Sequence, residues 1–331
     1  MFRGAASAGA ASGILSLTIS KPAATAQGNV MVASIAVRPN TAIITAPTAW
    51  TLLRRMDNAT ATANSLAVYY KVAGAGEPAS YTWTFSTSTG SAGGIQTFSG
   101  VDTAAPIDVE NGQNTVSGLT HTTLSVTTTV ANTMLVTSHS FSTAATWTPP
   151  GGMTEAVDRA NVAVPNAVGI SLEANYALQA AAGATGTKTA TASNDADVGN
   201  AHILALRPAS DSDGDGVPNV SDNCPNWPNP AQGLPPWPIP TNDPDCDGFS
   251  TAVENAAGTN ALVHCGADAW PADITNNTFS DTGDIGALTG SFGLSVPPAP
   301  ARYNIAPDPV DTFIDTADIA KMTSFFSLSC S

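Results

Sequence analysis

Aspartates at alternating positions mark a twelve-residue segment, 211–222, with the sequence D-S-D-G-D-G-V-P-N-V-S-D. Oxygen donors occupy its positions one, three, five, seven, nine and twelve, and a glycine at position six permits a sharp turn. Ca²⁺ takes six to eight oxygen ligands, and loops of this spacing wrap them around one ion. The segment therefore predicts a calcium site, and its candidate ligands are Asp211, Asp213, Asp215, the Val217 carbonyl, Asn219 and Asp222.

A second segment, 243–254, repeats the pattern as D-P-D-C-D-G-F-S-T-A-V-E and closes on a glutamate, which can bind through both carboxylate oxygens. The residues T-A-V-E-N-A-A-G at its end predict a short helix that stops at Gly258. Its candidate ligands are Asp243, Asp245, Asp247, the Phe249 carbonyl, Thr251 and Glu254.

Two weaker loops follow, and they are related by a repeat: T-F-S-D-T-G-D-I at Thr278 recurs as T-F-I-D-T-A-D-I at Thr312, 34 residues later. Segment 273–284 offers Asp273, Thr275, Asn277, the Phe279 carbonyl, Asp281 and Asp284. Segment 304–318 is three residues longer and offers Asn304, Asp308, Asp311, the Phe313 carbonyl and Asp318. Together the four loops predict three to four Ca²⁺ ions.

Apolar residues at helical spacing follow each of these two loops and predict two short helices that pack on each other. They are Ile285, Leu288 and Phe292, then Ile319, Met322 and Phe326.

The charge of the chain is concentrated around these loops. Residues 1–210 hold 10 acids and 9 bases, whereas residues 211–331 hold 16 acids and 2 bases, within a net charge of −15. An acidic segment of this kind repels itself and nucleic acid unless cations neutralise it. Charge alone is typical of a disordered tail, but the regular spacing favours a segment that folds around bound ions.

The four cysteines all lie in the acidic segment, which indicates two disulfides formed in an oxidising compartment, although three pairings are open. Zinc is the weaker interpretation because no C-x-x-C occurs. No stretch approaches the roughly 20 apolar residues of a membrane span. The N-terminus lacks the apolar core of a signal peptide, so we expect a leader that is either removed or not visible in this sequence, and an extracellular or cell-surface location.

The first 208 residues predict a different kind of structure. Tyr81, Trp83 and Phe85 alternate with polar residues, and about a dozen such runs lie between turn residues. The run from Gly28 is echoed from Ala131, about 103 residues later. The sequence therefore predicts an antiparallel β-sandwich or jelly roll built from two similar halves, about 12–110 and 115–208, which we expect to close one sandwich rather than two.

The segment D-S-D-G-D-G-V-P-N-V-S-D-N-C-P-N-W-P-N-P-A-Q resembles a thrombospondin type 3 repeat, over residues 211–250. The duplicated unit from about 265 to 331 resembles a dockerin pair, from which it departs by the insertion in its second loop. The resemblances imply that calcium acts as the core, with Cys224 paired to Cys246 and Cys265 left to Cys330. We expect three domains: a sandwich at 1–208, a thrombospondin-like stalk at 209–258 and a dockerin-like domain at 259–331.

No catalytic motif competes with these interpretations, because every dense acidic cluster already fits a calcium loop. Three histidines, His121, His139 and His202, lie in strand-like contexts, and Trp50, Trp83 and Trp147 are more typical of core than of a sugar-stacking platform. We predict a non-enzymatic structural surface protein that assembles with copies of itself into a filament or layer. Its small-residue N-terminus would add a strand to a neighbour's sheet. The alternative is a carbohydrate-binding adhesin, with surface glycans as partners, or an accessory protein docked to a cohesin-like protein.

Overall fold

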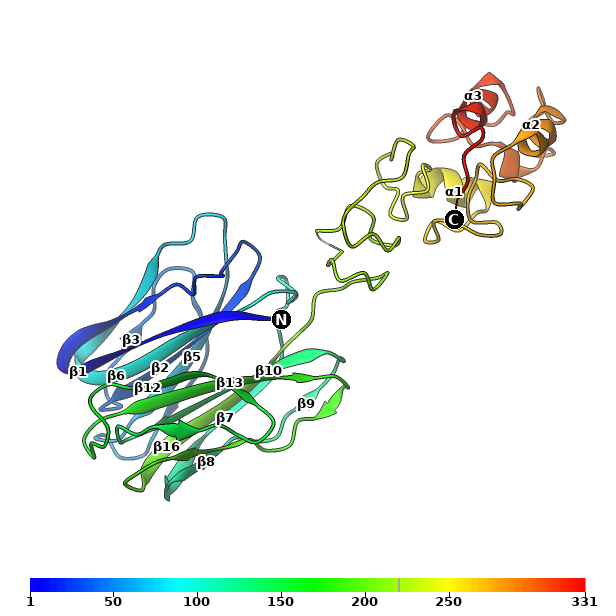
Figure 1. The fold of residues 1–331 in the computed structure, drawn as a ribbon. Coiled ribbons are helices and arrows are strands. Elements are labelled where there is room, and N and C mark those ends of the chain that lie inside the picture. Colours follow the sequence, from blue (N-terminus) through cyan, green and yellow to red (C-terminus); the bar gives the residue numbers. More distant parts are fainter. Residues whose placement is uncertain (220, 331) are drawn as a thin grey trace. The chain divides into compact units, whose positions relative to one another are not determined.

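The computed structural model of the chain describes residues 1–219 and 221–330, and it contains two compact units, Met1–Ala209 and Ser210–Ser331 (Figure 1). The fold is mainly antiparallel β, as the sequence predicts, and the α-helices of the described residues all lie in the second unit. No helix in the described part of the chain is long and apolar enough to cross a membrane.

Each half of the first unit forms one large sheet. In the first half the strand order is β1-β6-β2-β5-β4, with β3 paired to β6. These strands are β1 (Phe2–Ser20), β2 (Val30–Arg38), β3 (Ile44–Thr45), β4 (Thr51–Asp57), β5 (Ser65–Val72) and β6 (Ser80–Phe98).

In the second half the order is β7-β16-β10-β13-β12, which repeats the order of the first half strand for strand. These strands are β7 (Ile107–Gly118), β10 (Thr133–Phe141), β12 (Thr154–Ala160), β13 (Ser171–Gln179) and β16 (Asp197–Leu206). The short strands β8 (Thr120–Thr122), β11 (Trp147–Thr148) and β15 (Thr189–Ala192) form a small sheet, and β9 (Thr127–Thr128) pairs with β14 (Gly183–Ala184).

The two large sheets share one hydrophobic core, so the duplicated halves close a single sandwich. Val32 and Leu66 of the first sheet pack in the same cluster as Val136, Leu172 and Leu204 of the second. Strand β1 contacts β12 and β4 contacts β7, which brings the edges of the two sheets together. The sandwich built from two similar halves is thereby confirmed.

The true equivalence between the halves differs by one residue from the spacing of 103 in the sequence. Val32 and Val136, which are 104 residues apart, both face the shared core, and Ser34 Oγ lies 2.6 Å from Ser138 Oγ across the buried interface. A strand alternates faces at every residue, so a spacing of 103 would pair inward with outward positions. Met31 and Met134, which the sequence echo aligns, therefore lie on different faces of their sheets and are not structurally equivalent.

The N-terminal strand β1 completes the sheet of its own chain, and its addition to a neighbour's sheet stays a prediction. Residues of β1 pair with β6 of the same chain, from Phe2 opposite Phe98 to Ser20 opposite Ser80. The small side chains of β1 serve close packing instead: a Cβ at Gly9 would lie 2.6 Å from the Ala160 carbonyl oxygen beside β12.

The outer faces of both sheets are also covered. On the outer face of the first sheet, Trp50 and Trp83 lie in another hydrophobic cluster. On the outer face of the second sheet, Trp147 packs with Phe141. These tryptophans are at most 8% exposed, and His121, His139 and His202 are fully buried, as predicted for strand residues. The tryptophans are therefore core and present no sugar-stacking platform.

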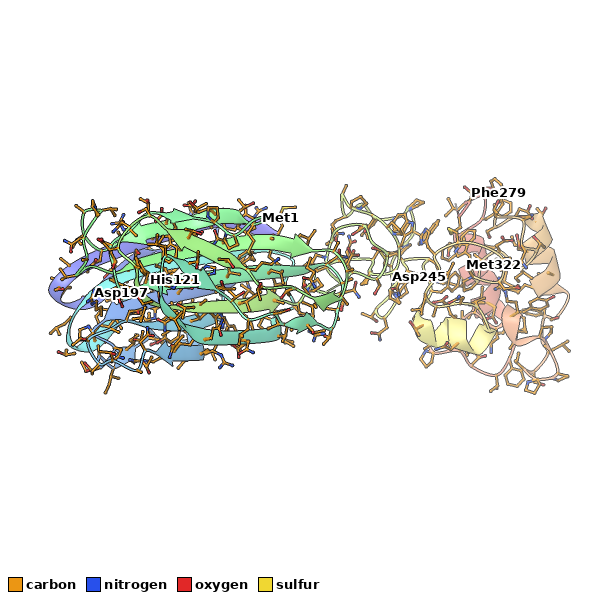
Figure 2. All side chains as sticks on the ribbon, turned by 90° about the horizontal axis from the view of Figure 1, so that it is seen from below. Met1, His121, Asp197, Asp245, Phe279 and Met322 are labelled. Atoms are coloured by element: carbon orange, nitrogen blue, oxygen red, sulfur yellow. A yellow bond between two sulfur atoms is a disulfide. The ribbon has the colours of Figure 1, made fainter. Side chains whose placement is uncertain are left out.

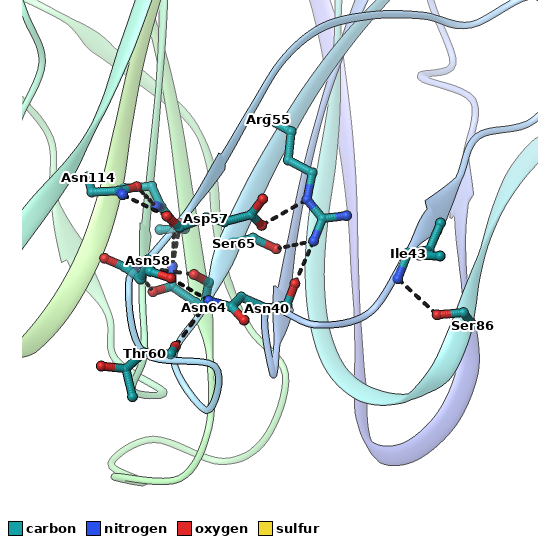
Figure 3. A network of polar contacts seen from close by, with 12 residues as sticks. Asn40, Ile43, Arg55, Asp57, Asn58, Thr60, Asn64, Ser65, Ser86 and Asn114 are labelled. Carbon is teal, nitrogen blue, oxygen red and sulfur yellow. Dashed lines mark hydrogen bonds and ion pairs between the residues drawn. The ribbon is translucent and has the colours of Figure 1, made fainter.

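A buried polar network joins the halves at one end of the sandwich (Figure 3). The Asn64 amide donates to Ser140 Oγ and to Asn200 Oδ1, at 2.8 and 2.7 Å, and the Asn58 amide donates to Asn64 Oδ1. Asn114 extends the network to the backbone of β4 by donating to the Asp57 carbonyl. Because these amides are satisfied across the interface, the network favours one register of the halves.

The second unit contains α1 (Thr251–Ala257), α2 (Thr282–Thr289), α3 (Thr316–Ser324) and a 3₁₀ turn, η1 (Ala301–Tyr303). One core cluster combines side chains from both predicted domains, 209–258 and 259–331, including Trp237, Phe249, Trp270, Leu288 and Met322. The predicted boundary at residue 258 stays a prediction.

The two copies of the 34-residue repeat are joined by two equivalent hydrogen bonds, one in each direction. Ser280 N–H donates to the Leu328 carbonyl, and its equivalent, Ile314 N–H, donates to the Leu294 carbonyl. The helices α2 and α3 contact each other, as predicted, and α1 ends at Gly258 with φ +81°. The helices stop at Thr289 and Ser324, however, so Phe292 and Phe326 lie beyond them and are about half exposed.

Candidate metal centre

Loop two, residues 243–254, brings four carboxylates together inside the second unit. Ligand atoms of Asp243, Asp245 and Asp247 lie within 4.8 Å of one another, and α1 supplies Glu254 (Asp245 is labelled in Figure 2). Asp245, Asp247 and Glu254 are each 0% exposed. Five of their oxygens have no hydrogen-bond partner among the described residues: both of Asp245, Oδ2 of Asp247 and both of Glu254.

This geometry strongly disfavours four negative charges in the absence of a cation. Burial, and then the neighbouring carboxylates, raises the pKa of Asp247 well above its ordinary range and that of Glu254 to about 8. Burial likewise raises the pKa of Asp243 to about 7. A hard cation would neutralise the charges and bind the free oxygens, which are the donors that Ca²⁺ prefers.

The backbone of loop two turns its amides toward these side chains. Asp247 N–H and Gly248 N–H donate to the two oxygens of Asp243, and Phe249 N–H donates to Asp247 Oδ1. Gly248 has φ +92°, and a Cβ there would lie 2.7 Å from the Phe325 ring, so position six needs glycine for both conformation and space. Thr251 begins α1, and its N–H donates to the Asn242 carbonyl.

Loop one, residues 211–222, forms a second cluster with more exposed ligands. Atoms of Asp211, Asp213 and Asp215 lie within 4.8 Å of one another, and Oδ2 of both Asp213 and Asp222 is buried without a hydrogen-bond partner in the described part of the chain. Asp211 accepts from Gly214 N–H and Gly216 N–H, and Asp215 from Val217 N–H and Asn229 N–H. The Asn219 amide instead bonds Ser212. The aspartates fit a calcium ion, with Asn219 turned to the backbone of the loop.

Loop three, residues 273–284, fits less well because, among the described residues, no three of its acids cluster and none of its carboxylate oxygens is buried without a hydrogen-bond partner. Asp273 accepts from Asn277 N–H and Thr278 N–H, and Asp284 accepts from Thr275 N–H and Asp281 N–H. Asp281 and Asp284 form a capping box at the start of α2. The Phe279 side chain is exposed.

Loop four, residues 304–318, is the least assembled. Both oxygens of Asp318 accept backbone N–H groups, and Asp311 accepts from Phe313 N–H. Asp308 is exposed, and Asn304 Oδ1 is buried without a partner among the described residues. Among the described residues, three acids lie close together in loop one and in loop two, but not in loops three and four. Calcium sites at loops three and four therefore stay predictions.

The cysteines form two disulfides, Cys224–Cys246 and Cys265–Cys330, with the pairing that the resemblance implies. The first ties loop two itself to the segment that follows loop one, the second joins two positions after loop two, and together they leave no thiolate for zinc.

Sequence reasoning missed the side chains that surround loop two from outside. Trp237, His264, Trp270 and Lys321 each hydrogen-bond to one of its carbonyl oxygens. They lie up to 73 residues from their partners, so no local pattern connects them to the loop. The one available signal was that a buried indole N–H requires an acceptor.

Comparison with known proteins supports the interpretation of loop one. A model of the thrombospondin type 3 repeat matches residues 209–232, a segment that contains loop one. This repeat is a calcium-binding motif of extracellular proteins. No curated protein and no solved structure matches the chain. The chain therefore carries one thrombospondin type 3 repeat beside acidic clusters that can hold metal.

Proposed function

We propose that this is a secreted, non-catalytic structural protein, in which calcium stabilises the second unit and copies of the chain assemble on an extracellular surface. The observation that carries the calcium part is the set of five buried carboxylate oxygens without hydrogen-bond partners in loop two. Burying ionised carboxylates without a partner costs several kcal/mol, so a bound cation that offsets that cost should strongly stabilise the folded unit at neutral pH.

The calcium part is tested by unfolding the second unit in calcium and in a chelator. Trp237 and Trp270 lie in its core, so their fluorescence reports its unfolding. We expect a large rise in midpoint with Ca²⁺ and a much smaller one with Mg²⁺, which demands stricter octahedral geometry. Equal midpoints in calcium and chelator would refute the proposal.

Exposed apolar side chains at equivalent positions of the repeat support the assembly part. Phe279 and Phe313, 34 residues apart, are each 50% exposed, and Phe292 and Phe326 are 51% and 45% exposed. Large apolar surface is costly to leave in water and is typical of protein contacts.

Sedimentation velocity and electron microscopy, with calcium and with a chelator, test assembly. We expect ordered assemblies in calcium that disperse on chelation, and weaker association of the double variant Phe279→Ser/Phe313→Ser. A matched change on the sandwich, Val116→Ser, where the valine is 85% exposed, is the control. A wild-type chain that stays monomeric in calcium at high concentration would contradict self-assembly. The sandwich tryptophans are buried, so carbohydrate stacking on them has no support.

A further inference from the structure

Four consecutive carbonyl oxygens of loop two each accept a hydrogen bond from a side chain outside the loop. His264 Nδ1 lies 2.6 Å from the Asp245 oxygen and Trp237 Nε1 lies 3.0 Å from the Cys246 oxygen. Trp270 Nε1 lies 3.0 Å from the Asp247 oxygen, and Lys321 Nζ lies 2.8 Å from the Gly248 oxygen. These four side chains form what we call the carbonyl clamp.

Three members of the clamp, Trp237, Trp270 and Lys321, act on the same peptide groups that orient the carboxylates. The peptide joining Cys246 to Asp247 bonds Trp237 through its carbonyl and Asp243 through its N–H. The next peptide bonds Trp270 through its carbonyl and Asp243 through its N–H. A trans peptide is planar, with C=O and N–H pointing opposite ways, so an outside bond to the oxygen fixes the direction of the N–H inside.

The third peptide shows the same relation. Its Gly248 carbonyl accepts from Lys321, and its Phe249 N–H donates to Asp247 Oδ1. Lys321 belongs to α3 and also lies over the Phe249 ring, with Nζ 4.5 Å from the ring centroid. The second half of the duplicated unit therefore holds the peptide that orients one of the loop-two carboxylates.

We propose that Trp237 and Trp270, with His264 and Lys321, are positioning residues for the loop-two ion: they hold its peptide planes so that the carboxylates converge before the ion arrives. The inference rests on the proposed calcium binding and deepens it. The calcium affinity of loop two would thus depend on residues of the later segment 264–321. A ligand set held in place in advance loses less conformational entropy on binding.

The indoles give the cleanest test because Trp→Phe removes the N–H and keeps an aromatic ring. Calcium binding to the full-length chain is followed by titration calorimetry, and the binding step that Glu254→Gln abolishes is assigned to loop two. We expect Trp237→Phe and Trp270→Phe each to weaken that step by ~3- to 10-fold, the equivalent of one lost hydrogen bond. Trp83→Phe is the matched control, since Trp83 is buried in the sandwich and its Nε1 has no partner among the described residues.

A purely structural role predicts a different result, namely lower stability in chelator with unchanged calcium affinity, and that result would overturn the proposal. If the variants fail to fold, a measurement on the wild-type chain still tests the proposal. The indole N–H resonances of Trp237 and Trp270 should shift together with the loop-two binding step, while those of Trp50 and Trp83 stay fixed. Indole resonances of the clamp that do not respond to that step also overturn it. A wild-type chain that binds no calcium instead refutes the proposed function.

Discussion

Replacing Glu254 by glutamine should stabilise the second unit without calcium and lose most of that advantage with calcium. In the calcium-free state the pKa of Glu254 is raised from 4.5 to about 8 by burial and by Asp245 and Asp243. At pH 7 the side chain must therefore be protonated in the folded state, over about 2.5 pH units above its unfolded pKa. At 1.36 kcal/mol per unit this costs up to about 3 kcal/mol. The uncharged glutamine avoids that cost.

The sign with pH follows from the raised pKa. The folded state binds a proton that the unfolded state has lost, so the wild-type penalty is absent below about pH 4.5 and grows until about pH 8. The calcium-free stability advantage of the glutamine variant should grow over the same range. In calcium this advantage should nearly disappear at pH 7, because the variant lacks a charged ligand that can bind through two oxygens. A ~100-fold loss of affinity at saturating calcium removes about 2.7 kcal/mol.

Urea unfolding followed by tryptophan fluorescence, in chelator and in calcium across pH 5 to 8, measures both effects. Asp268→Asn is the control: it removes one negative charge from an exposed residue of the same unit that lies outside the four loops. A glutamine variant that is less stable than wild type in chelator at pH 7 would refute the argument that repulsion and burial destabilise the empty loop. A variant that keeps its full advantage over wild type in calcium would show that Glu254 is not a ligand.

Three further predictions concern the scaffold. Burial raises the pKa of Glu173 to about 8, so Glu173→Gln should stabilise the sandwich relative to wild type at neutral pH. The advantage should grow by up to about 1.4 kcal/mol for each pH unit between about 4.5 and 8. Urea unfolding measures it, and a difference that stays constant with pH would contradict the prediction. Gly199→Ala should lower the sandwich melting temperature, at a cost of ~1–3 kcal/mol, because its Cβ would lie 2.3 Å from the Ser140 carbonyl oxygen; an unchanged calorimetric midpoint would show that the strands relax freely. Replacing Cys265 and Cys330 by serine opens a 65-residue loop and should destabilise the calcium-bound second unit by ~4 kcal/mol. Replacing Cys224 and Cys246 by serine opens a 22-residue loop and should cost ~3 kcal/mol. The midpoints of unfolding by chelator and by urea measure both effects, and the reverse order would contradict the loop-entropy estimate.

The duplication shows how far a pattern in the sequence reaches. Period-two alternation identified strands such as Tyr81 to Phe85, because the two faces of a strand differ in burial at every residue. The same property made the register vulnerable, since a spacing of 103 in place of 104 exchanges the inward and outward faces of β10. The shared burial of Val32 and Val136 and the contact of Ser34 with Ser138 across the core decide between them.

For the calcium loops, too, the sequence determines one part of the site and the tertiary structure another. By itself the sequence determined the candidate ligands of loops one and two, because residues within twelve positions fold around an ion through local turns such as that at Gly248. Only the tertiary structure decided that loop two is buried, with five carboxylate oxygens that lack hydrogen-bond donors among the described residues, whereas the acids of loop three form no such cluster there. It also placed Trp237, Trp270 and Lys321 behind the loop. Burial and contacts between distant residues depend on how the whole unit packs, and that packing leaves no local pattern in the sequence.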